Sequence, residues 1–279
     1  MSPVVRTRSR LPTGGLAFPA DLVVSLRSGR VHVFIGSGAS SSAGLTNWDD
    51  LMRDMIAVIK AENHVFSPRD LDGFLARADH LDIAELFRQT VGPSAYYLFL
   101  RDRYRRPVRP SALHKAIARL PVKAVFTTNY DKLLETAFRR SGLVDPPVVV
   151  FPEQLNYIDE DEVRIIKVHG DIDHPRSIVL TRSDYAAYAA RHREFVDLLQ
   201  TSINGRTMLF IGFGLRDLNF RRIYSDARNF FDSTNRQSYA FMTGTNAVER
   251  QIWHDEGLTI LPLARYTELP ACIGRLSVT

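Results

Sequence analysis

The sequence contains one cysteine, Cys272, among 279 residues, and it has no long apolar run. A single cysteine excludes an intrachain disulfide and a zinc site built from several cysteines. No apolar stretch approaches the roughly 20 residues that a membrane-spanning helix needs, so the sequence predicts no association with a membrane. The first residues also lack the apolar core of a secretory signal. Together these absences predict a cytoplasmic protein without a structural zinc ion.

Acidic residues are absent from the first 20 positions, where Arg6, Arg8 and Arg10 supply three of the five net positive charges. Prolines and glycines in the same stretch discourage regular structure, which predicts a flexible basic arm over residues 1–20. Five more arginines lie between residues 101 and 109. Such groups can contact nucleic acid, but more often they form a solvated surface. We therefore expect no direct contact with nucleic acid.

Short apolar runs alternate with segments of helical periodicity along the rest of the chain. The runs that predict strands are 31–35, 122–126, 148–151, 165–168, 177–180 (an edge strand), 207–211, 239–242 and 258–263. Apolar residues at helical spacing fill 48–61, 67–104, 111–120 and 183–203. This alternation predicts an α/β protein with a Rossmann-like, doubly wound parallel sheet. We expect one catalytic domain over residues 21–279, with a helical insertion at about 49–115.

A glycine-rich loop follows the first apolar run, 31–35. Gly36 and Gly38 have no Cβ, so the backbone can turn tightly and bring its N–H groups close to a diphosphate, while the serines of the loop add small hydroxyl donors. The third glycine of the dinucleotide-binding fingerprint is missing, because position 41 is serine, and no acidic residue ends a second strand about 20 residues later. The loop predicts nucleotide binding, with a glycine-rich packing turn as the alternative.

Three further apolar runs end in polar or glycine-containing segments, at 127–131, 169–170 and 212–214. Taken singly, each segment also fits a structural role, with Asn129 and Asp131 in a turn or cap and His169 in the core. The carboxyl ends of parallel strands meet at one edge of a sheet, where ligands of such folds bind. Four segments of this kind at the same edge favour a ligand site.

These segments resemble the motifs of the sirtuin family in order and spacing. The glycine-alanine-glycine-x-serine loop of sirtuins resembles residues 36–40, and their threonine-glutamine-asparagine-x-aspartate motif resembles 127–131. Their histidine-glycine pair matches His169–Gly170, and their glycine-threonine-serine turn resembles 212–214. The resemblance extends from about residue 30 to 263 and covers most of the chain.

Two departures from the sirtuin pattern indicate one branch of the family. No cysteines follow His169–Gly170, where protein-deacylating sirtuins carry four zinc ligands, and Asn47–Asp49 replaces their aspartate-phenylalanine-arginine. What remains is similar to the bacterial sirtuin-like NADases of antiphage defence. The resemblance implies hydrolysis of NAD+, as substrate and without zinc, to ADP-ribose and nicotinamide by a gated toxic effector of abortive infection. It also implies a homo-oligomer, a separate sensor or activator such as an Argonaute-type protein or a HerA-type ATPase, or both.

The resemblance assigns the catalytic roles to Asn129 and His169. Cleavage of the nicotinamide–ribose bond develops oxocarbenium character at the ribose, so the site must hold the ring and position a nucleophile. An asparagine amide suits the ribose hydroxyls or the attacking water, and a histidine suits a general base near neutral pH. The residues expected to bind NAD+ are Gly36, Ser37, Gly38, Ala39, Ser40, Asn47, Trp48, Thr128, Asp131, Gly212, Phe213 and Gly214, and no residue is expected to bind a metal.

Three other functions remain open at this point. One is an NAD-dependent deacylase that works without zinc, and another is a non-catalytic module that senses NAD or ADP-ribose. The third is a metal hydrolase, because residues 169–174 resemble a histidine-x-histidine-x-aspartate-histidine motif with one ligand changed. Such a site needs further histidines on later strands, and neither His192 nor His254 is well placed.

Overall fold

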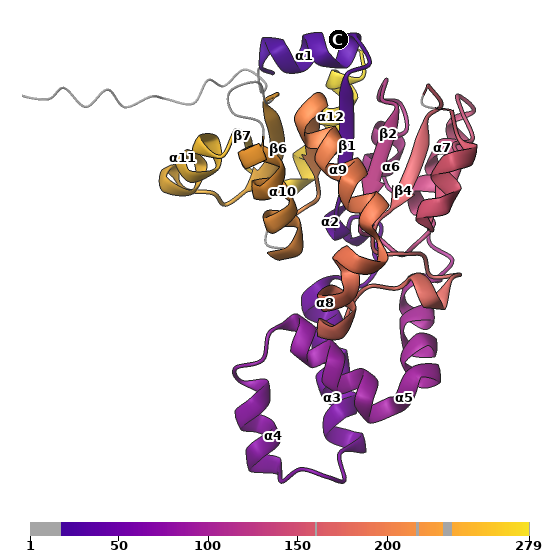
Figure 1. The fold of residues 1–279 in the computed structure, drawn as a ribbon, viewed down its shortest axis with the longest axis vertical. Coiled ribbons are helices and arrows are strands. Elements are labelled where there is room, and N and C mark those ends of the chain that lie inside the picture. The colour runs from indigo at the N-terminus through magenta and orange to yellow at the C-terminus, as the bar shows by residue number, and fades with distance from the viewer. Residues whose placement is uncertain (1–17, 160, 216–217, 231–235, 279) are drawn as a thin grey trace, which may run out of the picture.

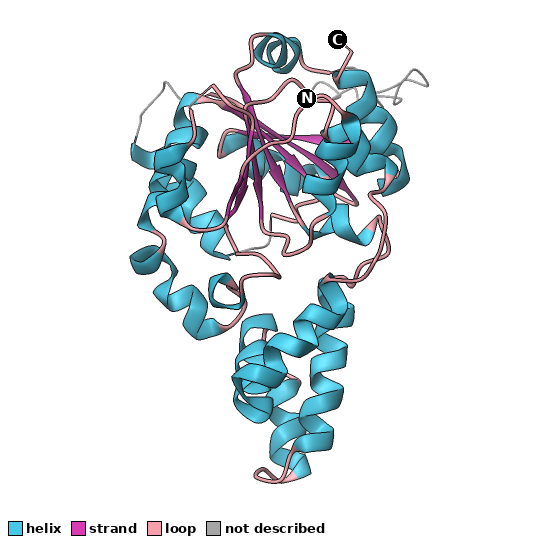
Figure 2. Cartoon of the chain, turned by 90° about the vertical axis from the view of Figure 1, so that its right-hand side faces the viewer, coloured by secondary structure: helices cyan, strands magenta, loops and turns pink. Residues whose placement is uncertain are grey.

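A computed structural model describes residues 18–159, 161–215, 218–230 and 236–278 of the chain. Its centre is a seven-stranded sheet in the order β3-β4-β2-β1-β5-β6-β7, in which every neighbouring pair is parallel (Figures 1 and 2). The strands are β1 (Val31–Ile35), β2 (Ala124–Thr127), β3 (Val148–Val149), β4 (Arg164–Lys167), β5 (Thr207–Ile211), β6 (Ser238–Thr243) and β7 (Leu258–Leu263). The strand order changes direction at β1, which lies between β2 and β5 and marks the switch point where ligands of such sheets bind.

Helices cover both faces of the sheet. The helices of the described residues are α1 (Ala20–Arg27), α2 (Ser37–Ser41), α3 (Trp48–Glu62), α4 (Pro68–Leu75), α5 (His80–Tyr104), α6 (Ala112–Ile117), α7 (Leu133–Ser141), α8 (Arg182–Arg191), α9 (Arg193–Gly205), α10 (Leu218–Phe230), α11 (Ala247–Asp255) and α12 (Leu269–Leu276). Strand β1 is buried throughout, and its side chains alternate between two cores. Val33 and Ile35 pack with residues of α1, α6, α7 and α12, whereas Phe34 packs with residues of α9, α10 and α11. The predicted doubly wound α/β sheet is therefore confirmed.

Helices α3, α4 and α5 form the helical insertion, which lies beyond the carboxyl ends of the strands (Figure 1). Each begins with a side-chain cap, because Asn47, Ser67 and Asp79 accept hydrogen bonds from the backbone N–H three residues further on. The three helices share an apolar core, which includes Leu51 and Phe87 and also contains Tyr130, Ile172, Ile178 and Leu180 from the loops at the sheet edge. The insertion thus packs against the loops at the edge of the sheet where the polar segments end.

The prediction of an edge strand at 177–180 is wrong. Residues Pro175–Ser177 form a 3-10 turn, and no strand of the sheet includes 178–180. The segment bonds instead to the loops at the sheet edge, since the N–H of Val179 donates to the carbonyl oxygen of His169 at 3.0 Å and the hydroxyl of Tyr130 donates to the carbonyl oxygen of Val179 at 2.8 Å. A short apolar run can be buried by packing against loops as well as by strand pairing, and periodicity alone does not distinguish the two.

Helix α1 overlaps the expected arm only at Ala20, and no helix is predicted from the sequence over 21–27. In the structure Leu22 and Leu26 are buried, and Phe18 packs edge-on against Phe241 with ring centroids 6.5 Å apart. The rest of the expected arm, residues 1–17 with its three arginines, lies outside the described residues. In the part of the chain that the structure describes, no helix is both long and apolar enough to cross a membrane.

Candidate active site

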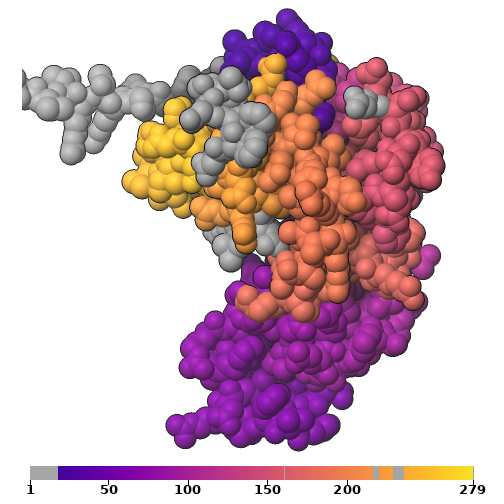
Figure 3. All heavy atoms as spheres, viewed as in Figure 1, coloured from indigo at the N-terminus to yellow at the C-terminus, as the bar shows by residue number. Residues whose placement is uncertain are grey.

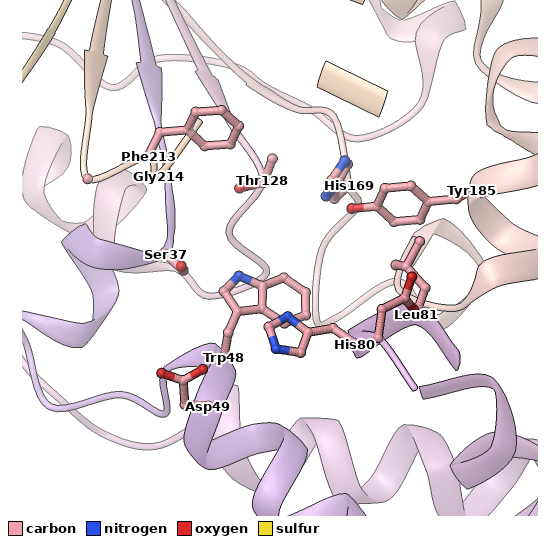
Figure 4. Close-up of a pocket in the computed structure, with 12 residues that line it drawn as sticks. Ser37, Trp48, Asp49, His80, Leu81, Thr128, His169, Tyr185, Phe213 and Gly214 are labelled. Carbon is pink, nitrogen blue, oxygen red and sulfur yellow. The ribbon is translucent and has the colours of Figure 1, made fainter. Parts of the chain in front are cut away.

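The segments that follow β1, β2, β4 and β5 surround one cavity at the carboxyl edge of the sheet. Its volume is about 360 Å³, and its lining residues are Ser37, Trp48, Asp49, Asp79, His80, Leu81, Thr128, His169, Tyr185, Gly212, Phe213 and Gly214 (Figure 4). One wall comes from the strand ends and the other from the first residues of α3 and α5 and from α8. The helical insertion and α8 therefore form the side of the cavity that lies opposite the strand ends.

The two glycine segments of the cavity lie against each other through their backbones. The N–H of Gly38 donates to the carbonyl oxygen of Gly212 at 2.9 Å. A Cβ on Gly36 would lie 2.4 Å from that carbonyl oxygen and 2.6 Å from the Cα of Phe213, and Gly212 itself has a φ of +63°. Only residues without a side chain allow this approach. The loop after β1 and the turn after β5 therefore form one backbone unit.

Replacing Gly36 with alanine is expected to lower the free energy of unfolding by about 1–3 kcal/mol, because the new methyl group would overlap backbone atoms that cannot move aside. Gly214→Ala is the matched control, since a Cβ at that position meets no atom within 4 Å. Its effect on stability should stay within about 0.5 kcal/mol. Urea denaturation of the two variants measures the difference, and equal stabilities would contradict the packing described here.

Asn129 connects the loop after β2 to the glycine loop. Its Nδ2 donates to the carbonyl oxygen of Gly36 at 3.0 Å and to the hydroxyl of Ser40 at 2.9 Å. That hydroxyl in turn donates to the Oδ2 of Asp131 at 2.5 Å. The Oδ1 of Asn129 is buried and has no hydrogen-bond partner among the described residues. A buried acceptor without a partner is costly, so this oxygen is the atom of the amide that remains for a ligand or water.

Several residues expected to bind NAD+ lie behind the cavity instead of lining it. Ala39 and Ser40 are almost fully buried. The Oδ1 of Asp131 accepts a hydrogen bond from the N–H of Leu133 at 2.9 Å, at the start of α7, so its carboxylate already has two partners in the protein. Asn47 caps α3. Gly36 and Gly38, which are also expected to bind NAD+, do not line the cavity either. The same holds for Asn129, one of the two residues expected to be catalytic. These residues form the structure behind the cavity wall. The expected NAD+-binding residues that line the cavity are Ser37, Trp48, Thr128, Gly212, Phe213 and Gly214.

His169 follows β4 and lines the cavity, with 7% of its surface exposed. The next residue, Gly170, has a φ of +89°, and a Cβ there would lie 2.1 Å from the carbonyl oxygen of Ser177. The histidine-glycine pair thus has a local explanation, because the turn that presents the imidazole to the cavity requires glycine at its second position.

Beneath these loops lies a buried ionic cluster around Lys167. Its Nζ donates to the carbonyl oxygens of Tyr130 and Asp131 at 3.1 and 2.6 Å, to Glu135 at 3.1 Å and to Asp171 at 2.7 Å. Burial alone would lower the pKa of Lys167, but Glu135 and Asp171 outweigh it and raise that pKa. The ammonium group stays charged and ties the loop after β2 to the loop after β4.

Asp171, a candidate ligand of the metal-hydrolase alternative, belongs to this cluster. Its Oδ2 lies 2.7 Å from the Nζ of Lys167 and 2.6 Å from the Nζ of Lys132. Burial acts to raise the pKa of Asp171, and the two lysines and a backbone N–H lower it below its ordinary value. Two ammonium groups at this distance oppose the binding of a cation. Asp171 therefore has a structural role.

Five residues of the cavity were missed from the sequence: Asp49, Asp79, His80, Leu81 and Tyr185. The ring of His80 is stacked on that of Trp48, with centroids 6.2 Å apart and planes 1° from parallel. For those that lie on the insertion, the only sequence signal is the pair of capping residues Asn47 and Asp79, which mark where its helices α3 and α5 begin. Nothing in the sequence indicates that these helix ends face the sheet.

The strand order, the glycine loop after β1 and the cavity at the switch point define a doubly wound α/β fold of the sirtuin type. The structure is similar to the crystal structure of a SIR2 homolog–NAD complex, with a TM-score of 0.55, 12% identity and 95% of each chain covered, which supports the fold. Residues 123–261 match the family model described as a SIR2-like domain. The chain thus contains a SIR2-like domain.

Particular relatives are NAD(+) hydrolases and a defence-associated sirtuin. The chain is 30% identical over 222 residues to the NAD(+) hydrolase ThsA of Enterococcus faecium and 26% identical over 228 residues to that of Bacillus cereus (strain MSX-D12). It is 25% identical over 251 residues to the defense-associated sirtuin 2 of Bacillus subtilis. These matches cover 78%, 81% and 88% of this chain but 44%, 45% and 24% of the relatives. The chain therefore spans less than half the length of the relatives it matches.

Proposed function

We propose that this protein hydrolyses NAD+ to ADP-ribose and nicotinamide. The observation that carries the proposal is the convergence of His169 and the glycine segments on one cavity, with the unpartnered Oδ1 of Asn129 beside the glycine loop. The names of the relatives, which are NAD(+) hydrolases and a defence-associated sirtuin, agree with it.

Hydrolysis breaks the bond between the nicotinamide nitrogen and C1′ of the ribose. The bonding electron pair goes to the nicotinamide ring, which leaves as a neutral molecule, and the oxygen of a water molecule bonds to C1′. In our proposal His169 accepts the proton of that water, and the Oδ1 of Asn129 orients the water or a ribose hydroxyl. The loop at Gly36 and Gly38 lies at the switch point, where the diphosphate of such folds binds.

The wall formed by the insertion suits the nicotinamide half of the substrate. The pyridinium ring of NAD+ carries a positive charge, and the cavity has an indole, Trp48, and a carboxylate, Asp49, on this side, whereas the carboxylate of Asp79 is paired with Arg182. An aromatic face and acidic groups both attract a flat cation. Because cleavage neutralises the ring, this attraction weakens as the product forms and favours its release.

The test is incubation of the purified full chain with NAD+, with and without an acylated peptide, followed by chromatography of the products. We expect nicotinamide and ADP-ribose in equal amounts whether or not the peptide is present. Release that depends on the peptide would indicate a deacylase. Tight binding of NAD+ without turnover would indicate a sensor.

We further propose that the enzyme is a gated, cytoplasmic effector of antiphage defence that acts by abortive infection. A freely active NAD+ hydrolase would deplete the NAD+ of its own host, so activity must depend on self-assembly, on a separate sensor or activator, or on both. The insertion supports this idea, because its helices supply Trp48, Asp79 and His80 to the cavity wall. A shift of the insertion would open or close the site. The same assay across a range of protein concentrations tests assembly, and full activity of a monomer would exclude gating.

A further inference from the structure

Two tyrosines of α8 contact the imidazole of His169. The ring centroids of Tyr185 and Tyr188 lie 5.4 and 6.0 Å from that of His169, with interplanar angles of 68° and 76°. Both contacts are edge-to-face, and both come from one helix, on which the two tyrosines lie about one turn apart. The orientation of the His169 ring thus depends on α8 as well as on its own loop.

The hydroxyl groups of the two tyrosines have different surroundings. The hydroxyl of Tyr188 donates to the carbonyl oxygen of Val168 at 2.9 Å, and the side chain is buried. Tyr185 is half-buried and lines the cavity, and its hydroxyl points toward the imidazole of His169 (Figure 4). Tyr188 is therefore a packing residue, whereas Tyr185 brings a polar group to His169 inside the cavity.

Helix α8 is held firmly in this position. Thr181 caps it by accepting a hydrogen bond from the N–H of Asp184. The carboxylate of Asp184 accepts a hydrogen bond from Arg88 of α5 at 3.0 Å, and the hydroxyl of Ser183 donates to Glu85 of α5 at 2.7 Å. The space-filling view shows the same junction, where α8 and the insertion meet (Figure 3). A side chain on a rigid element fixes the geometry of its neighbour better than one on a loop.

We propose that Tyr185 is a positioning residue that acts through His169, a role that rests on the proposed function. A histidine works as a base only when the nitrogen that faces the substrate is unprotonated, and the partner of its ring nitrogens decides which tautomer is present. A phenol can both donate and accept a hydrogen bond, so the Tyr185 hydroxyl selects the tautomer and ring orientation in which His169 accepts the proton of water. No sequence motif marks this residue, because it belongs to a helix distant from the motif segments.

The test compares Tyr185→Phe with Tyr188→Phe, which removes a hydroxyl from the same helix and the same histidine contact. We expect Tyr185→Phe to lower kcat about tenfold or more, with KM within about twofold, as for an interaction made only in the transition state. Tyr188→Phe should lower the melting temperature, because a buried carbonyl loses its donor, and leave kcat within about twofold of the unchanged protein.

A second readout is independent of turnover. The ¹⁵N chemical shifts of the His169 imidazole, assigned by comparison with the His169→Ala protein, report its tautomer. We expect them to change in Tyr185→Phe and to stay unchanged in Tyr188→Phe. Unchanged shifts and kcat in Tyr185→Phe, or equal changes in both variants, would overturn the proposal. If the unchanged protein did not cleave NAD+, the proposed function would fail, whereas the chemical shifts would still test the link between Tyr185 and His169.

Discussion

Replacing His169 with alanine is expected to abolish the release of nicotinamide from NAD+, with a loss of about 10²–10⁴-fold or more in kcat, as for removal of a general base. The imidazole lines the cavity and lies on the loop that follows β4, at the sheet edge where the glycine segments meet. Its removal takes away the proposed proton acceptor and leaves the sheet and the ionic cluster intact. Chromatographic measurement of nicotinamide at saturating NAD+ checks this result.

His174→Ala is the matched control, because His174 belongs to the same loop region but does not line the cavity. Its side chain is 48% exposed and lies 3.5 Å from Asp171. We expect its kcat to stay within about twofold, as for a surface substitution away from the site. A folded His169→Ala protein that cleaves NAD+ at the unchanged rate would remove the histidine from the mechanism.

Asn129→Ala should abolish cleavage as well, but for two reasons that activity alone cannot separate. The substitution removes the free Oδ1, and it also removes the Nδ2 that bonds to Gly36 and Ser40 and so connects two loops. His169→Ala is therefore the clearer test of the mechanism. A stability measurement on Asn129→Ala shows how much of its effect is structural.

Replacing Lys167 with methionine is expected to lower the free energy of unfolding by about 3–5 kcal/mol, the usual result of removing one partner from a buried ion pair. The side chain is 1% exposed, and its loss leaves the carboxylates of Glu135 and Asp171 in the interior with less compensation. Two backbone carbonyls after β2 lose a donor too. Urea denaturation at neutral pH measures the change.

Lys132→Met provides the comparison, because Lys132 binds the same Oδ2 of Asp171 but is 40% exposed. A pair that is open to solvent contributes little, and Lys167 remains to compensate Asp171, so we expect a loss of about 1 kcal/mol or less. Equal losses in the two variants would show that burial does not decide the strength of this cluster.

The sequence predicted most strands and the helical insertion because both depend on local patterns. Strand β1 is an apolar run buried on both faces, and the caps and apolar spacing of α3 are readable over a few residues. The prediction failed at 177–180, where an apolar run is buried by the loops of Tyr130 and His169. Burial by remote segments leaves no periodic signal.

The candidate site, like the fold, has parts that the sequence predicts and parts that only the tertiary structure shows. The motif segments at Gly36, Asn129, His169 and Gly212 can each be read in the sequence, because each follows directly on an apolar run that predicts a strand. The parallel sheet then brings all four to one edge, so the sequence by itself determined the sirtuin-like fold and the edge of the sheet where the candidate site lies. Only the tertiary structure decided what completes it. Tyr185, His80 and Lys167 act through contacts between segments far apart in the chain, and such contacts arise only when helices and strands pack.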